Sequence, residues 1–60
     1  MLVYGKNVLY EIDKTKIRKV YISRNDYMPY LKDNNIKYEY VDKNRLDKMV
    51  HGVHQGIVID

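Results

Sequence analysis

The sequence predicts a small α/β domain in which short helices cover a sheet that is largely parallel. The chain has 60 residues, which is enough for one domain with a modest core. Segments with helical and with strand-like spacing of apolar residues alternate along it, in the order α-β-α-β-α-β. Strands joined by right-handed helical crossovers lie parallel, so we expect neighbouring strands to run in the same direction.

Three short helices are expected, each beginning at a small polar residue that can accept the free N–H groups of a first turn. Asn7, or a residue just before it, caps the first helix. Asn25 or Asp26 caps the second, and Asp42 caps the third. The second helix ends at Asn34–Asn35, since asparagine tolerates the left-handed conformation of a helix end. The expected helices lie within residues 5–13, 26–33 and 42–50.

Three strands are expected between and after these helices. The first two are rich in β-branched and aromatic residues, and the last is an apolar run with the length of a buried strand. They occupy residues 17–22, 36–41 and 57–59. Tyrosine supplies all of the aromatic bulk, because the chain has seven tyrosines and neither phenylalanine nor tryptophan. Each buried tyrosine must place its hydroxyl near water or a partner, which favours a thin domain.

The composition excludes several classes of protein. Without cysteine the chain has no disulfide framework, thiolate metal site or cysteine nucleophile, and a cytoplasmic location is expected. No apolar run approaches the roughly 18 residues that span a bilayer, so we expect no membrane among the partners. The first residues lack the charged and apolar regions of a secretory signal.

Residue types that perform catalysis or bind metals are sparse. His51 and His54 stand three positions apart, as in some metal sites, but Gly52 interrupts any helix between them. A third ligand would have to come from a distant carboxylate, so no metal is expected. Ser23 lacks a nucleophile elbow, and the glycines match no phosphate-binding loop. We therefore expect no catalysis from this chain alone.

The net charge of +3 is unevenly distributed along the chain. Five basic residues lie between Lys14 and Arg24, and this stretch contains no acid. A local basic stretch attracts polyanions, of which nucleic acid is the commonest inside cells. An ordinary solvated surface rich in lysine is the alternative interpretation.

Two polar segments that contain glycine lie far apart in the sequence. They are Tyr4–Val8 and His51–Gly56. Asn7, His54 and Gln55 offer compact donors and acceptors for unpaired RNA, and the glycines would let a ribose-phosphate backbone come close. Lys6 and the basic stretch would bind phosphates, with an affinity that falls as salt rises. In the alternative interpretation Asn7 only caps a helix, and the other two side chains bond the backbone of a tight loop.

These segments resemble the amino-terminal substrate-binding domain of the SpoU/TrmH family of RNA 2'-O-ribose methyltransferases. The resemblance includes the strand Lys19–Ile22, residues Leu46–Lys48 and the run His54–Val58, and it covers nearly the whole chain in the same order. The ending, His-Gln-Gly followed by two apolar residues, is more specific than the Gly-x-Asn opening.

The resemblance implies a three-layer α/β/α sandwich like that of the RNA-binding ribosomal proteins of the L7Ae/L30e type. It also implies that the domain holds structured RNA, ribosomal or transfer RNA, while a separate knotted domain binds S-adenosylmethionine and transfers the methyl group. The chain stops at Asp60, where the family continues into a linker and that catalytic domain. The second helix, with only Asp26–Asp33 available, is shorter than is usual in the family. One face is then incompletely covered, which leaves room for a homodimer.

Seven residues are expected to contact RNA. They are Gly5, Lys6, Asn7, Arg18, Arg24, His54 and Gln55. Among the tyrosines, Tyr27 and Tyr30 are the freer candidates for stacking on bases, whereas Tyr10, Tyr21 and Tyr38 are expected in the core. The competing hypothesis is a protein interaction module that forms homodimers or docks on its own catalytic domain.

Overall fold

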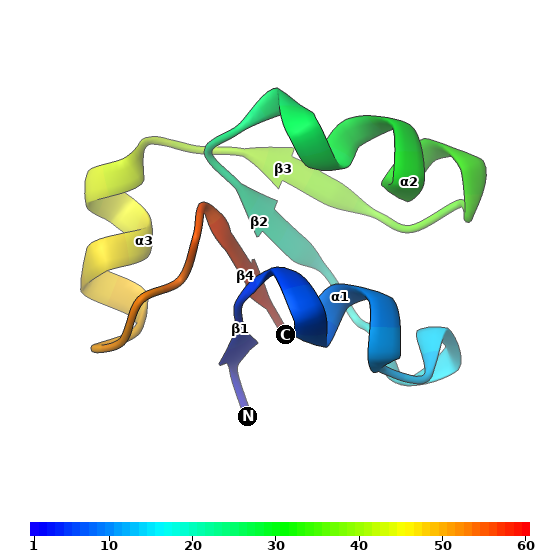
Figure 1. The fold of residues 1–60 in the computed structure, drawn as a ribbon, viewed down its shortest axis with the longest axis horizontal. Helices are drawn as coiled ribbons and strands as arrows, with labels where there is room; N and C mark the ends of the chain where they lie inside the picture. The colour runs from blue at the N-terminus through cyan, green and yellow to red at the C-terminus, as the bar shows by residue number, and fades with distance from the viewer.

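The computed structural model describes all 60 residues, which form a small α/β domain with one four-stranded sheet (Figure 1). The strands lie in the order β1-β4-β2-β3 across the sheet. Their bounds are Val3–Tyr4 for β1, Val20–Ile22 for β2, Tyr38–Tyr40 for β3 and Ile57–Ile59 for β4. The sequence did not predict β1, because two residues are too few to show an alternating pattern.

The prediction of a largely parallel sheet is wrong. Only β2 and β3 run parallel, whereas β4 is antiparallel to both of its neighbours, β1 and β2. The chain leaves β3, forms α3 (Lys43–Met49) and returns to the same end of the sheet, where the Ser23 N–H bonds to the carbonyl oxygen of Gly56. A connection that returns to the end it left reverses the strand direction, so α3 is not a crossover between parallel strands.

The helices fall where the sequence predicts them, with different starts. Helix α1 spans Lys6–Glu11, α2 spans Met28–Asp33, and short 3-10 turns cover Lys14–Lys16 and Asn25–Tyr27. Asn7 does not cap α1: Gly5 takes the N-cap position with a φ of 104°, a conformation open to glycine. Asn35 has a φ of 55°, as expected where the second helix ends. None of the helices has the length and apolar character that a membrane crossing needs.

Apolar side chains form a separate cluster on each face of the sheet. The larger cluster contains Leu9, Val20, Ile22, Tyr27, Leu31, Ile57 and Ile59. The smaller cluster contains Val41, Leu46, Val50 and Val58. Successive side chains of a strand point to opposite faces, so Val58 lies on the face away from Ile57 and Ile59. Helices α1 and α2 therefore cover one face, and α3 packs against the other.

The expected three-layer sandwich of the L7Ae/L30e type is not confirmed. The second face carries a single helix of seven residues, and Tyr21 and its cross-strand neighbour Glu39 are only half-buried there. The ammonium of Lys19 lies 2.8 Å from the Glu39 carboxylate. The cations of Lys19 and Arg45 both lie over the Tyr21 ring. Charged side chains thus cover the part of the sheet that α3 leaves open.

The burial of two tyrosines differs from the expectation. Tyr27 is 3% exposed and belongs to the larger core cluster, whereas Tyr10 is 47% exposed. Tyr27 can be buried because its hydroxyl donates to the carbonyl oxygen of Gln55 at 2.6 Å. Spacing along the chain does not reveal this acceptor, which lies 28 positions away.

Candidate nucleic-acid interface

The two glycine-flanked segments meet at the start of α1. The Lys6 N–H donates to Oε1 of Gln55 at 2.8 Å, and the Gly5 N–H donates to the carbonyl oxygen of Ile57 at 3.3 Å. Lys6 is the first residue of α1, so its N–H has no acceptor within the helix. The Gln55 side chain supplies that acceptor from the other end of the chain. The two segments, which lie far apart in the sequence, are therefore in direct contact in the fold.

Gln55 and Gly56 form the tip of a tight turn that leads into β4. The Ile57 N–H donates to the carbonyl oxygen of His54 at 3.1 Å, and φ is 55° at Gln55 and 80° at Gly56. Positive φ at both central positions is the pattern of a type I′ turn. Glycine adopts this conformation freely, whereas glutamine is strained in it. A strained residue that tertiary contacts hold in place is typical of a functional position.

The contacts that hold Gln55 leave part of its side chain free. Lys6 uses Oε1, while Nε2 carries two N–H donors that bond to no group of the protein, and the residue is exposed. Burial raises the pKa of Tyr27 above its ordinary value, so the Tyr27 hydroxyl stays protonated and keeps donating to the Gln55 carbonyl. The turn therefore presents an amide donor to solvent from a fixed backbone.

His54 lies behind this turn, and it is buried, with 6% of its surface exposed. The Gly56 N–H donates to its Nδ1 at 2.9 Å, and its Nε2 lies 2.6 Å from Oδ1 of Asp47 on α3. Since a backbone N–H can only donate, Nδ1 is unprotonated and the Nε2–H donates to the carboxylate. Both ring nitrogens expected to contact RNA are thus engaged inside the protein, where they fix the turn to α3.

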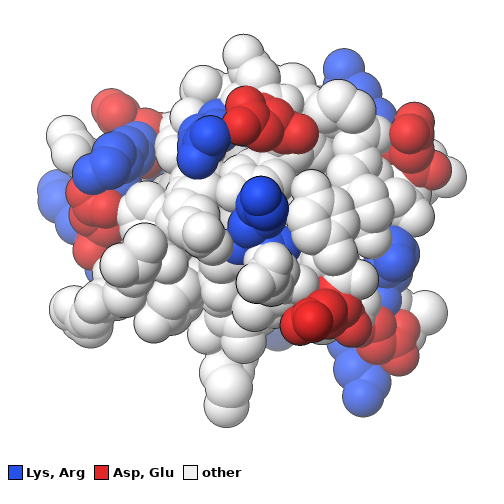
Figure 2. All heavy atoms as spheres, viewed as in Figure 1, with Lys and Arg blue, Asp and Glu red and all other residues white.

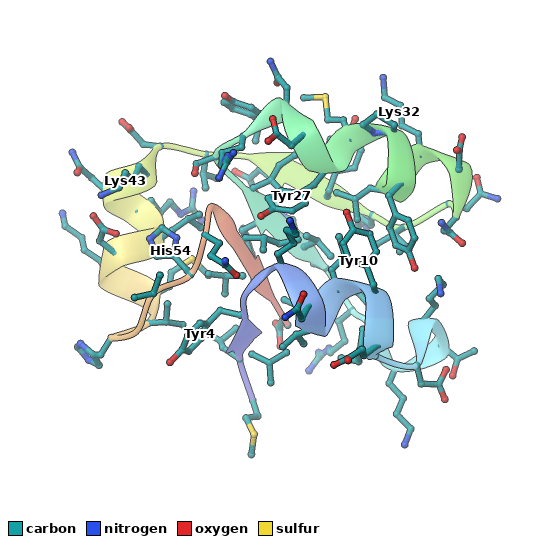
Figure 3. The ribbon with its side chains drawn as sticks, viewed as in Figure 1. Tyr4, Tyr10, Tyr27, Lys32, Lys43 and His54 are labelled. Atoms are coloured by element: carbon teal, nitrogen blue, oxygen red, sulfur yellow. The ribbon has the colours of Figure 1, made fainter.

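Asp47 links this histidine to a lysine. Its hydrogen bond with His54, and next its bond with Lys43, hold the pKa of Asp47 below the ordinary value of 3.8. The ammonium of Lys43 lies 3.3 Å from Oδ2, and Figure 3 shows Lys43 and His54 on the same side of the molecule. The carboxylate therefore stays charged between its two partners. No group of three or more histidine, aspartate or glutamate side chains is placed to hold a metal ion.

Side chains of the protein itself fill the space beside two of the glycines. A methyl group added to Gly56 would lie 2.5 Å from Cδ of Arg24, and one added to Gly52 would collide with the Tyr4 hydroxyl. From the sequence, the RNA backbone is expected to approach at the glycines of these segments. In the structure, Gly56 instead allows the Arg24 side chain to lie directly against the turn.

The basic residues expected at the interface are divided between the two ends of the sheet. Arg24 follows β2 and lies beside the turn, where it pairs with Asp26 at 2.8 Å. Arg18 precedes β2, and its N–H donates to the carbonyl oxygen of Asp60, past the opposite end of β4 from the turn. The predicted residues that share one end of the domain are Gly5, Lys6, Asn7, Arg24, His54 and Gln55. Arg18 does not join them.

An open hollow of about 490 Å³ lies between this turn and α3. Its lining consists of Ser23, Arg24, Lys43, Asp47 and residues 52–56. Only one of these nine residues is hydrophobic. The volume lies within the range of about 300–1,000 Å³ that is usual for ligand sites. Its charged side chains are Arg24, Lys43 and Asp47, and the two cations pair with Asp26 and Asp47.

The fold and this surface define a class of protein: a small α/β domain whose candidate interface joins two distant segments and carries exposed amide and basic side chains. Residues 2–60 match the family of RNA 2'-O ribose methyltransferase substrate-binding domains, and the chain belongs to this family. The resemblance read from the Gly-x-Asn and His-Gln-Gly segments is thereby confirmed, and the family supports a role in RNA binding. No curated protein and no solved structure matches the chain.

Sequence reasoning missed Tyr27 and Asp47, the two residues that hold the turn from inside. Their contacts join positions 28 and 7 residues apart, across a sheet and a loop, and no local spacing indicates them. The available signal in the sequence was His54, a polar ring two positions before the turn glycine Gly56. A polar ring beside a tight turn needs partners once it is buried, and the nearest helix supplies one.

Proposed function

We propose that this domain is a non-catalytic RNA-binding module that positions structured RNA, ribosomal or transfer RNA, for a 2'-O-ribose methyltransferase that uses S-adenosylmethionine. The supporting observation is the 2.8 Å contact between the Lys6 N–H and Gln55 Oε1, which makes one surface from two distant segments. S-adenosylmethionine would bind to a separate methyltransferase domain. The residues of the present surface would hold the substrate only.

The chemistry of the surface fits unpaired or irregular RNA. The free Nε2 of Gln55 and the exposed amide of Asn7 can donate to base edges or to 2'-hydroxyls, and the side-chain carbonyl oxygen of Asn7 can accept. Lys6 and Arg24 supply positive charge for phosphates beside these amides. His54 acts as a positioning residue, because its ring holds the turn and does not reach solvent.

The net charge of the chain agrees with this assignment. Figure 2 shows basic atoms near the centre of one face, and basic and acidic atoms side by side toward its rim. The hollow beside Gln55 is lined by two cations, Arg24 and Lys43, and by one acid, Asp47. The net charge of +3 over the whole chain favours a polyanion over a neutral partner.

The test is a titration of the chain with folded transfer RNA and with a ribosomal RNA fragment over a salt series. We expect the binding constant to fall as salt rises from about 50 to 300 mM, because lysine contacts release counterions from phosphates. Lys6→Ala should weaken binding and reduce the salt slope by about 1. Lys37→Ala, which removes an exposed lysine before β3, is the matched control and should have a smaller effect. Equal losses in both variants, or no RNA binding at all, would contradict the proposal.

The second candidate function is a protein interaction module. Its support is a group of exposed apolar residues near the chain start and the loop before the turn: Met1 is fully exposed, Leu2 is 37% exposed and Val53 is 84% exposed. Sedimentation equilibrium without RNA distinguishes the two functions. Dimers that form with rising concentration, and that Val53→Ser abolishes, in a chain without affinity for RNA, would favour the interaction module.

A further inference from the structure

Tyr10 on α1 is an exposed aromatic residue whose ring is held in one orientation. It is 47% exposed, although its ring contacts the Tyr30 ring of α2 nearly at a right angle, with centroids 4.8 Å apart and an interplanar angle of 82°. Figure 3 shows Tyr10 on the side of α1 that faces α2 and Tyr27. Because its neighbour already restricts the ring, a flat ligand that stacks on Tyr10 orders little that was free before.

One lysine lies four positions before Tyr10 on α1, and another lies four positions after it in the 3-10 turn Lys14–Lys16, beyond the end of α1. Lys6 precedes it by four positions on α1, so the two side chains share a helix face. Lys14 follows it by four positions, and its ammonium lies 5.4 Å from the centre of the Tyr30 ring. Both lysines are exposed, and neither takes part in an ion pair. Lys6, Tyr10 and Lys14 thus form a row of cation, aromatic ring and cation, called the α1 row below.

Two acids lie near this row in the sequence. Glu11 follows Tyr10 directly, and adjacent residues of a helix point about 100° apart around its axis. Asp13 lies close to Lys14: its Oδ1 accepts from the N–H and from the hydroxyl of Thr15, at 3.0 Å and 2.7 Å, and the carboxylate keeps its negative charge. Asp13 therefore offsets part of the charge of Lys14, whereas Lys6 forms no ion pair.

We propose that the α1 row is a binding site for unpaired RNA, in which one base stacks on Tyr10 and the flanking phosphates contact Lys6 and Lys14. The inference rests on the proposed function, which supplies the polymer. The row continues the candidate interface, because the backbone of Lys6 is bonded to Gln55 at 2.8 Å. Bases within a duplex are stacked on both faces, so an exposed tyrosine ring selects nucleotides that are unpaired.

The test compares a short single-stranded oligoadenylate with an RNA hairpin that has a fully paired stem. We expect Tyr10→Leu, which keeps an apolar contact with Tyr30, to weaken oligoadenylate binding about 5- to 100-fold, as for loss of one stacking contact. Tyr10→Phe keeps the ring face and should bind within about twofold of the unaltered chain. Tyr40→Leu is the matched control, because Tyr40 is also exposed, at 53%, but lies on β3. Circular dichroism on each variant reports whether it folds.

A second measurement does not depend on any variant folding. In the unaltered chain, the ring protons of Tyr10 should shift upfield in NMR spectra when oligoadenylate binds, because a stacked base shields them. Unshifted Tyr10 resonances, or a Tyr10→Leu variant that folds and binds like the unaltered chain, would overturn the stacking site. Competition by polyglutamate as effective as that by RNA would also overturn it, since charge alone would then explain the row. The proposed function is tested separately, by the salt-dependent binding of transfer RNA to the unaltered chain.

Discussion

The backbone N–H of Lys6 donates to Oε1 of Gln55 at 2.8 Å, across 49 positions of sequence. The bond makes the candidate interface a property of the tertiary fold. Gln55 can cap α1 only while β4 is paired between β1 and β2, because that pairing holds the turn at the start of the helix. If the turn at Gln55–Gly56 opened, the first N–H of α1 would lose its acceptor. The order of the candidate interface and the order of α1 are therefore coupled through one side-chain oxygen.

Substitutions of Gln55 separate its role as the acceptor for the Lys6 N–H from its proposed role in RNA contact. Gln55→Ala removes the acceptor for Lys6 and should cost about 0.5–1.5 kcal/mol of unfolding free energy, the usual net contribution of one hydrogen bond. Gln55→Glu keeps an acceptor and places a negative charge at a helix start, so stability should be retained. The glutamate lacks the Nε2 donors and repels phosphates, so affinity for RNA should fall at least about threefold. Urea denaturation and an RNA titration on each variant measure the two effects, and unchanged RNA affinity in Gln55→Glu would contradict the assigned role.

Gly5 is needed for the backbone at the start of α1. Its φ of 104° with a ψ of 150° lies in a region that other residues rarely adopt. Gly5→Ala should therefore cost about 1–3 kcal/mol of unfolding free energy, even though a methyl group would meet only Gln55 Oε1, at 3.5 Å. Asn44→Ala, at an exposed position within α3, is the control and should change stability little. Equal stability of Gly5→Ala and the unaltered chain, measured by thermal unfolding, would show that the backbone can relax at this position.

The sequence predicted where most elements lie, because apolar spacing and turn residues are local signals. Ile57–Ile59 forms β4 as expected, and Asn35 adopts the left-handed conformation. The direction of β4 was not predictable in this way. It depends on whether α3 travels back along the sheet, and the packing of Leu46 against Val58 decides that only in three dimensions. A right-handed crossover rule applies to parallel connections and does not show which connections are parallel.

The two segments of the candidate site were also predictable, because turn and helix-start residues are local signals. Glycine next to Gln55 indicates a tight turn, and the opening Gly5 indicates a helix start, so both halves of the interface were visible in the sequence. The roles within it were not visible. His54 is chemically suited to contact RNA, but burial beside Asp47 gives it a structural role, and Tyr27 is buried where a free ring was expected. Both outcomes depend on partners from other elements.

Substitution of His54 tests its positioning role. His54→Ala leaves the buried N–H of Gly56 without an acceptor and should cost about 1–3 kcal/mol of unfolding free energy. His54→Asn can place its Oδ1 near the position of Nδ1, so it should recover part of this loss and slow the amide hydrogen exchange of Gly56 relative to His54→Ala. If His54 contacted RNA directly, its removal would weaken RNA binding without a change in stability or in the exchange of Gly56.

Acid should weaken the fold through Asp47. Its pKa is lowered by the hydrogen bond with His54 and then by that with Lys43, so the folded state binds a proton less readily than the unfolded state. The contribution of this carboxylate to stability is therefore fully present above its ordinary pKa of 3.8 and is lost as pH falls through the lower pKa of the folded state. Glu39, whose pKa Lys19 lowers from 4.5, acts in the same direction. We expect thermal midpoints that are constant above about pH 5 and fall between about pH 4 and 2.

Asp47→Asn isolates the part of this loss that comes from the pair with His54. An amide at this position can still accept from the Nε2–H of His54, but it does not titrate. The variant should be less stable than the unaltered chain at neutral pH, since it loses the charged acceptor and the ion pair with Lys43. Its midpoint should then fall less steeply below about pH 4, so that the two curves approach each other in acid. Asp33→Asn, which removes a carboxylate that forms no ion pair, is the matched control. If Asp47→Asn and the unaltered chain lost stability in parallel, the bond between Asp47 and His54 would not be a source of the acid sensitivity.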